Sequence, residues 1–172
     1  MFYKTETIAL VIDAPSMNTA AKNINLLIDW KKFRSEFARR GRLLRASYIA
    51  YVIDSEDHNP MIKQIDWMSY NGFNAIVKKA HVVDHDQVKK FNINVEFTLE
   101  AMQLAIAVDH IVLFTGDSAY EPLIEKIQHM GVRVSVCGVT DITANCLRKQ
   151  ADSFMDITAI SDLIAMEGAK HD

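Results

Sequence analysis

The most constraining feature of this chain is a regular alternation of short apolar runs with longer segments of helical spacing. The runs are apolar throughout instead of alternating with polar residues, which is typical of strands buried on both faces of a parallel sheet. Five clear runs span residues 7–13, 43–53, 74–80, 110–115 and 132–139, and 153–157 is a candidate for a sixth.

The segments between these runs carry apolar residues at helical spacing. They predict helices over residues 17–41, 59–72, 93–108, 120–131, 142–151 and 158–168. Strands that alternate with helices in this way fold into a three-layer α/β sandwich with right-handed crossovers. A chain of 172 residues without a linker or repeat suits one domain, so we expect a single unit over residues 1–172.

Composition and cysteine usage exclude several classes of protein. Asp29, Asp54 and Asp109 interrupt the longest apolar segments, so no run reaches the roughly 20 residues that a membrane helix needs. The N-terminus passes directly into a strand pattern and resembles no signal peptide. Cys137 and Cys146 lack a CxxC spacing and make no disulfide framework. We expect a cytoplasmic protein without a membrane partner.

Two of the predicted strands end on an aspartate that is followed by a break in the pattern. These are Asp13 in "VIDAPS" and Asp117 in "FTGDSA". If the sheet order is 3-2-1-4-5, both carboxylates lie in the crevice where the strand order reverses. Like charges at such a place favour a bound cation, and Mg²⁺ or Mn²⁺ suits a site of carboxylates and water. The alternative is that each aspartate only caps a helix.

The helix predicted over residues 93–108 offers a third acid. Glu96 and Glu100 are four residues apart and share one face of this helix. Glu100 falls at the edge of the apolar stripe, from which we expect it to reach the strand ends. The competing interpretation is that both glutamates are simply solvated.

A basic cluster precedes the second strand. The stretch 31–45 holds seven basic residues against Glu36 alone, which leaves a local charge of +6 although the whole chain has −3. Such a cluster raises affinity for a phosphate backbone by releasing counterions. The alternative is the solvated face of an amphipathic helix. The candidates for guiding RNA are Lys31, Lys32, Arg34, Arg39, Arg40 and Arg42.

Some weaker signals have ordinary explanations. The segment 81–86, "HVVDHD", has a spacing that a metal ion could use, but polar loops are far commoner than such sites. Trp30 and Trp67 are predicted to be core residues on helical faces and not a platform for stacking bases. For Tyr120, just after the Asp117 loop, packing beneath the loop and stacking on a base both stay open.

Several pieces of the chain together resemble a known family. They include "ALVID", "GRLLRASYIAYV", "IDWMSYNGF", "VDHIVLFTGD", "PLIEKIQHMGVRVSV" and "LRKQADSFMDI". In this order they resemble bacterial NYN-domain proteins, the LabA-like branch of the PIN-like ribonuclease superfamily. The resemblance covers nearly the whole chain. It implies a parallel sheet in 3-2-1-4-5 order and hydrolysis of RNA that depends on Mg²⁺ or Mn²⁺.

The resemblance also implies site residues, and here the chain departs from the family pattern. Asp13 matches the Asp of I-D-G-x-N, while Ser16 stands at the Asn position. In "NINVEFTLEAM", Asn94 and Glu100 stand where N-x-D-x-x-L-x-x-D-A-M has aspartates. In "TGDSAY", the counterpart of S-G-D-G-D-F, Asp117 is retained and Ala119 replaces the second acid.

The implied catalytic residues are therefore Asp13, Glu100 and Asp117. Asn94 joins these three as a metal ligand, and Ser16, Glu96 and Ser118 are supporting residues. The loss of charge at positions 94 and 119 makes a two-metal site improbable.

Two functions follow: a weakened metal-dependent ribonuclease, or a catalytically degenerate module that binds RNA or a protein. Nucleotide-cofactor chemistry is disfavoured, because neither a G-x-G-x-x-G fingerprint nor a P-loop is present. The apolar surface of the last helix would suit a homodimer.

Overall fold

The computed structural model describes residues 2–53, 60–80 and 92–167. Its six strands pair in parallel in the order β3-β2-β1-β4-β5-β6. This confirms the predicted α/β class and strand order, with β6 as the sixth strand at the edge. The strands are β1 (Thr7–Asp13), β2 (Arg42–Ile53), β3 (Asn74–Ala80), β4 (His110–Phe114), β5 (Arg133–Gly138) and β6 (Ser153–Asp156).

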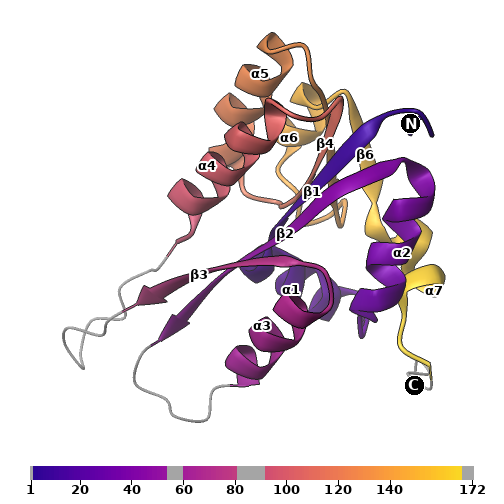
Figure 1. The fold of residues 1–172 in the computed structure, drawn as a ribbon, viewed down its shortest axis with the longest axis vertical. Coiled ribbons are helices and arrows are strands. Elements are labelled where there is room, and N and C mark those ends of the chain that lie inside the picture. Colours follow the sequence, from indigo (N-terminus) through magenta and orange to yellow (C-terminus); the bar gives the residue numbers. More distant parts are fainter. Residues whose placement is uncertain (1, 54–59, 81–91, 168–172) are drawn as a thin grey trace.

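Helices cover both faces of this sheet, as Figure 1 shows. One apolar core forms between the sheet and helices α1, α2, α3 and α7, and the other between the sheet and α4, α5 and α6. The helices are α1 (Ala14–Asn23), α2 (Trp30–Arg40), α3 (Pro60–Tyr70), α4 (Asn94–Ala105), α5 (Glu121–His129), α6 (Asn145–Gln150) and α7 (Ser161–Ile164), with short 3₁₀ turns η1 (Ser118–Tyr120) and η2 (Ile157–Ile160).

Aspartates cap the start of several of these helices. Asp13 caps α1, Asp29 caps α2 and Asp117 caps η1, each by accepting a backbone N–H from the following turn. A side-chain oxygen at this position satisfies a donor that the helix itself leaves unpaired. At the other end, Gly72 and Gly131 follow α3 and α5 with φ of 84° and 81°, a conformation that glycine adopts without strain.

Two predicted helices differ from the structure. The helix predicted over residues 17–41 is two helices, α1 and α2, joined by an irregular segment in which Asn25 has a φ of 51°. Ile28 in this segment forms an antiparallel bridge with Ala165, which follows α7. The helix predicted over 158–168 was also wrong in length, because helical structure extends only over η2 and α7. A tertiary contact therefore overrides the helical pattern in both places.

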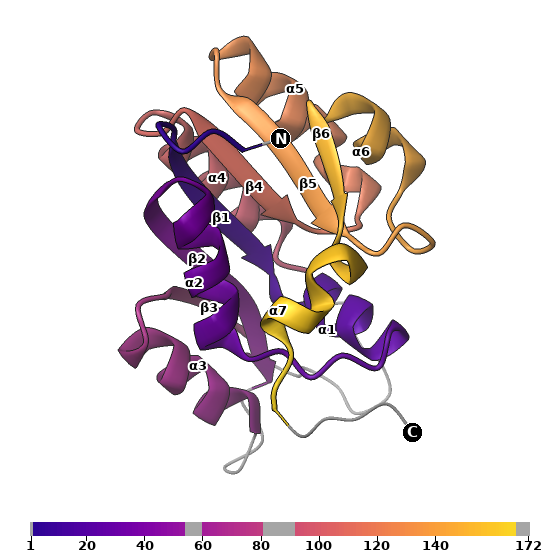
Figure 2. The same ribbon diagram turned by 90° about the vertical axis from the view of Figure 1, so that its right-hand side faces the viewer.

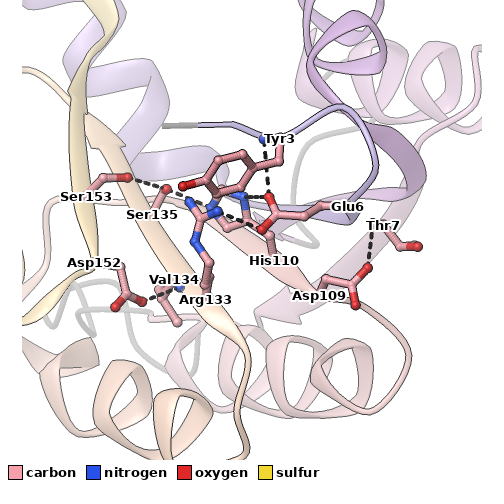
Figure 3. A network of polar contacts seen from close by, with 10 residues as sticks. All are labelled: Tyr3, Glu6, Thr7, Asp109, His110, Arg133, Val134, Ser135, Asp152 and Ser153. Carbon is pink, nitrogen blue, oxygen red and sulfur yellow. Dashed lines mark hydrogen bonds and ion pairs between the residues drawn. The ribbon is translucent and has the colours of Figure 1, made fainter.

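A polar network holds the amino ends of β1, β4 and β5 (Figure 3). Glu6 forms an ion pair of 2.6 Å with Arg133, and its Oε2 lies 3.4 Å from His110 Nδ1. His110 Nε2 lies 2.7 Å from the Ser135 hydroxyl, which also bonds Ser153 at 2.6 Å. Buried polar groups are stable only when they are paired, so this network fixes the end of the sheet that is remote from Asp13 and Asp117.

The described part of the chain contains no helix that is both long enough and apolar enough to cross a bilayer. The segment 81–86, with its metal-like spacing, lies outside the described residues. Trp30 is a core residue with 9% of its surface exposed, as predicted. The prediction for Trp67 was wrong, because it is 36% exposed and lines a surface cavity.

Candidate functional site

Asp13 and Asp117 lie at the same end of the sheet. β1 and β4 are neighbours, with Ile12 in register with Phe114, so the residues that follow both strands emerge side by side. Figure 2 shows the arrowheads of β4 and β5 pointing toward the end of the sheet where α1 and α7 lie. Strand order reverses between β1 and β4, which is where parallel α/β sheets form their binding crevices.

Both carboxylates also perform a structural task. Asp13 Oδ1 accepts the Ser16 N–H at 2.9 Å, and Asp117 Oδ1 accepts the Ala119 N–H at 2.9 Å. The capping interpretation is therefore correct for each aspartate. Capping engages one oxygen of each carboxylate, so the other oxygen can still take a further contact.

Thr115 connects the two acids. Its hydroxyl donates to Asp13 Oδ2 at 3.3 Å and accepts the Asp117 N–H at 3.2 Å. Thr115 is almost completely buried. Thr115 therefore links the Asp13 carboxylate to the backbone of Asp117. Sequence analysis overlooked this role, although the polar residue between the apolar strand and "GD" was a usable signal.

Burial and nearby negative charge shift the pKa values of groups in the crevice. Burial raises the pKa of Asp13, and the nearby charge of Asp117 adds to this, while hydrogen bonds from Ser16 and Thr115 oppose it. Burial also raises the pKa of the Tyr120 hydroxyl, and Asp13 and Asp117 add to that effect. Both residues are therefore shifted toward their neutral forms.

Tyr120 and Asn94 complete this side of the crevice. The Tyr120 ring is buried and packs on Phe97 with centroids 4.3 Å apart, so packing is the correct alternative. Its hydroxyl donates to Asn94 Oδ1 at 3.3 Å. Asn94 begins α4 and thus contributes an amide, already engaged by a phenol, near the two acids. The hydroxyl of Tyr120 was not anticipated as a polar group of the site.

The Glu100 side chain is held by hydrogen bonds from residues of β2 and β3. Its Oε1 accepts the Ser47 hydroxyl at 2.6 Å and the Asn74 amide at 3.2 Å. Ser47 is in register with Val11, two residues before Asp13, so Glu100 is anchored to the interior of the sheet. Glu100 is buried, which excludes the solvated alternative. We expected Glu100 to reach the strand ends, but these contacts hold its carboxylate to residues of β2 and β3.

Two other expected supporting residues, Glu96 and Ser118, show no hydrogen bond to Asp13 among the described contacts, although the charge of Glu96 helps to raise the pKa of Tyr120. Glu96 forms an ion pair of 3.0 Å with Lys78 on β3. Ser118 is exposed at the start of η1. Ser16 is an expected supporting residue that contacts an acid, because its backbone N–H and its side chain both hydrogen-bond Asp13.

The basic residues do not form one surface beside the acids. Arg42 bonds the Thr7 hydroxyl at 2.6 Å, and Thr7 and Asp13 are the first and last residues of β1. Six strand residues at 3.3 Å each place Arg42 roughly 20 Å from Asp13. Arg39 and Arg40 both pair with Glu36, and Arg34 bonds the carbonyl of Gly72 at 3.1 Å.

Lys31 and Lys32 are at the start of α2. The Lys32 ammonium pairs with Glu167 at 3.2 Å. The Lys31 ammonium lies 6.0 Å from the centroid of the Trp67 ring. Of the six predicted RNA contacts, Lys31 is the exposed cation that lines a cavity.

A cavity of about 300 Å³ opens beside Asp117. It lies between the first turn of α1 and the carboxyl ends of β4 and β5. Its polar wall includes Ser16, Thr115, Asp117 and Thr143, and buried Cys137 lines it too. The cavity provides room for a ligand group next to one of the two acids.

A divalent cation does not fit the donor set well. Mg²⁺ and Mn²⁺ need several oxygen ligands, preferably charged ones. Among the described residues, no three His, Cys, Asp or Glu side chains are grouped so that they could hold a metal ion. Asp13 and Asp117 remain as a pair, and each already accepts a backbone N–H. The arrangement is that of an acidic crevice with too few ligands for a two-metal centre.

One known protein family matches most of the chain. The NYN domain matches residues 7–160, which run from the first residue of β1 to the end of η2. This chain belongs to the NYN domain family. The predicted family membership is thereby confirmed, and the NYN domain includes both Asp13 and Asp117.

Two relatives extend the comparison. This NYN domain is 22% identical to the low amplitude and bright protein LabA of Synechococcus elongatus over 168 residues, or 95% of this chain and 90% of LabA. Its fold is similar to the crystal structure of a protein of unknown function, VPA0982, from Vibrio parahaemolyticus. That match has a TM-score of 0.76 and 24% identity, and covers 96% of this chain and 99% of the other. The structural likeness shows the fold alone.

Proposed function

We propose that this NYN domain binds RNA and that its acidic crevice does not support efficient hydrolysis. Family membership suggests RNA as the ligand, because members of this family typically act on RNA with a divalent metal ion. The observation that carries the second part is the position of Glu100. Its hydrogen bonds to Ser47 and Asn74 engage this carboxylate within the sheet, which supports a crevice with fewer metal ligands than the family pattern has.

The uncharged groups around Asp13 support the same proposal. Asn94 supplies an amide where the family pattern has an aspartate, and the Tyr120 hydroxyl binds it. Each missing carboxylate weakens the attraction for a divalent ion in a partly dehydrated site. These departures from the family pattern support a crevice that holds a divalent metal ion weakly.

The experiment compares binding with cleavage on one substrate. A fluorescent single-stranded RNA is titrated with the protein in EDTA, and the same RNA is incubated with the protein and Mn²⁺. We expect saturable binding in EDTA and intact RNA after incubation with Mn²⁺. Failure to bind any RNA would contradict the proposal.

A second candidate is a slow ribonuclease with one cation held by Asp13 and Asp117. The observation that favours it is the position of both acids at the ends of neighbouring strands: the charge of Asp117 adds to the raised pKa of Asp13, and a cation would relieve this repulsion. Cleavage that requires Mn²⁺ and disappears in Asp117→Asn would establish this candidate. Cleavage that survives Asp117→Asn would arise from another site or a contaminant.

A further inference from the structure

A second and larger cavity lies away from the two acids. It has a volume of about 670 Å³ and is formed by the end of α1, the start of α2, and α3. Trp67 on α3 lines it with an indole that is 36% exposed, and the less exposed Trp30 lines it from α2. An exposed aromatic ring in a cavity can stack on a flat ligand, and a nucleobase is such a ligand because every base has a π face.

Two lysines line this cavity. Lys22 in the last turn of α1 and Lys31 in the first turn of α2 both line it and are exposed. Asp29 also lines it, but its Oδ1 accepts the N–H groups of Lys31 and Lys32, at 3.0 Å each. The Asp29 carboxylate therefore caps the start of α2. An aromatic ring with flanking ammonium groups matches a base joined to phosphate.

The Lys31 ammonium is placed to serve such a ligand. It lies 6.0 Å from the Trp67 centroid, at the outer limit of a cation–π contact. Lysine has a flexible stem, so a base can displace the ammonium from the ring while the ammonium pairs with a phosphate.

A third cavity along α1 lies between the Trp67 cavity and the acidic crevice. It has a volume of about 320 Å³ and shares Asn18 and Lys22 with the Trp67 cavity. The same cavity shares Pro15 and Thr19 with the one beside Asp117. The α1 helix begins right after Asp13 and has 10 residues, so it is about 15 Å long. An extended strand of a few nucleotides spans that length.

We propose that the Trp67 cavity is a nucleobase subsite for single-stranded RNA whose backbone passes along α1 to the Asp13–Asp117 crevice. This inference rests on the proposed function and adds where the RNA lies. A base stacks on Trp67, and the ammonium groups of Lys22 and Lys31 pair with the adjoining phosphates. Duplex RNA does not fit this description, because its bases are already stacked on each other.

The test measures the affinity for a fluorescein-labelled oligouridine by anisotropy, in EDTA so that no metal-dependent cleavage occurs. We expect Trp67→Ala to weaken binding about tenfold, or about 1.4 kcal/mol, because it removes the ring on which a base stacks. Trp67→Phe retains an aromatic face, so its affinity for oligouridine should be within about threefold of the wild-type affinity. Lys31→Ala should lower the slope of log affinity against log salt by about one.

The chain offers a matched control on the same helix. Tyr70 is 89% exposed and is not among the residues that line the cavity. Tyr70→Ala should leave oligouridine affinity unchanged. Binding to an RNA duplex of equal length should be insensitive to Trp67→Ala.

A second readout reports on Trp67 directly. The chain has two tryptophans, and Trp30 is largely buried. Oligouridine should therefore quench the intrinsic fluorescence of the unchanged protein, and Trp67→Phe should lose most of that quenching. Circular dichroism establishes that each variant is folded.

The outcomes separate this inference from the proposed function. If the protein binds oligouridine and Trp67→Ala binds equally well, the subsite is wrong while RNA binding stands. If the protein binds no RNA, the proposed function fails and the subsite with it. If uridine monophosphate quenches the fluorescence at the same concentration as oligouridine, the cavity takes a free nucleotide, and the RNA subsite is refuted.

Discussion

The Ser47 hydroxyl donates a 2.6 Å hydrogen bond to Glu100, and this contact between β2 and α4 is buried. It fixes a carboxylate that the family pattern suggests for the catalytic site to the middle of the sheet. Asn74 on β3 contributes a second hydrogen bond to the same oxygen. A side chain held by two neighbouring strands is a structural anchor, so the crevice at the strand ends depends on Asp13 and Asp117.

Removal of the Ser47 hydroxyl, which bonds Glu100, should lower the stability of the protein. We expect Ser47→Ala to lower the free energy of unfolding by about 1–3 kcal/mol, because it leaves a buried carboxylate without its shortest hydrogen bond. Urea denaturation measures the change. Ser69→Ala, which removes an exposed hydroxyl bonded to the Ile65 carbonyl, is the control and should change stability by less than about 0.5 kcal/mol. Equal effects of the two substitutions would show that the Ser47–Glu100 contact is unimportant.

Removal of the charge on Asp13 should stabilise the protein at neutral pH. Burial and Asp117 raise the pKa of Asp13, so the ionised form opposes folding above that pKa. Asp13→Asn keeps a side-chain cap for α1 and should raise the free energy of unfolding by roughly 0.5–1 kcal/mol at pH 7. The gain should shrink as the pH falls, since Asp13 itself then becomes neutral. Urea denaturation at several pH values measures this, and a loss of stability at pH 7 would contradict it.

The network at the opposite end of the sheet should make stability depend on pH. Burial lowers the pKa of His110 to about 4, with help from the charge of Arg133 and against the charge of Glu6. Below the ordinary histidine pKa of about 6.5, the unfolded chain therefore binds a proton that the native protein does not. The free energy of unfolding should fall by roughly 2 kcal/mol between about pH 6.5 and pH 5.

The variant His110→Gln tests the origin of this effect. Glutamine retains a polar group next to Ser135 but does not titrate. Its stability should vary less with pH over the same interval, as measured by urea denaturation. An unchanged slope in the variant would place the titrating group elsewhere.

The fold was predictable because its signals are local. Continuous apolar runs such as Ile111–Phe114 identify buried parallel strands, and Asp13 and Asp117 mark the ends of two of them. The break between α1 and α2 was not predictable from spacing, since it depends on Ile28 pairing with Ala165 far along the chain.

The site was only partly predictable. Periodicity placed Glu100 at the edge of the apolar face of its helix, but its depth along the sheet follows from strand register, which pairs Ser47 with Val11. The basic residues before β2 share a short stretch of sequence, yet Arg42 lies at the amino end of the sheet and Lys31 lines the Trp67 cavity. The places of Arg42 and Lys31 in the fold could not be derived from the spacing of charges alone.

A calorimetric titration with Mn²⁺ tests most directly the claim that the crevice has too few carboxylates. The unchanged protein is compared with Asn94→Asp/Ala119→Asp, which supplies two carboxylates at the positions where the family pattern has them. We expect no saturable binding by the unchanged protein at micromolar Mn²⁺ and saturable binding by the double variant, because added anionic ligands strengthen the attraction for a divalent ion. Saturable micromolar binding by the unchanged protein that Asp117→Asn abolishes would contradict the account.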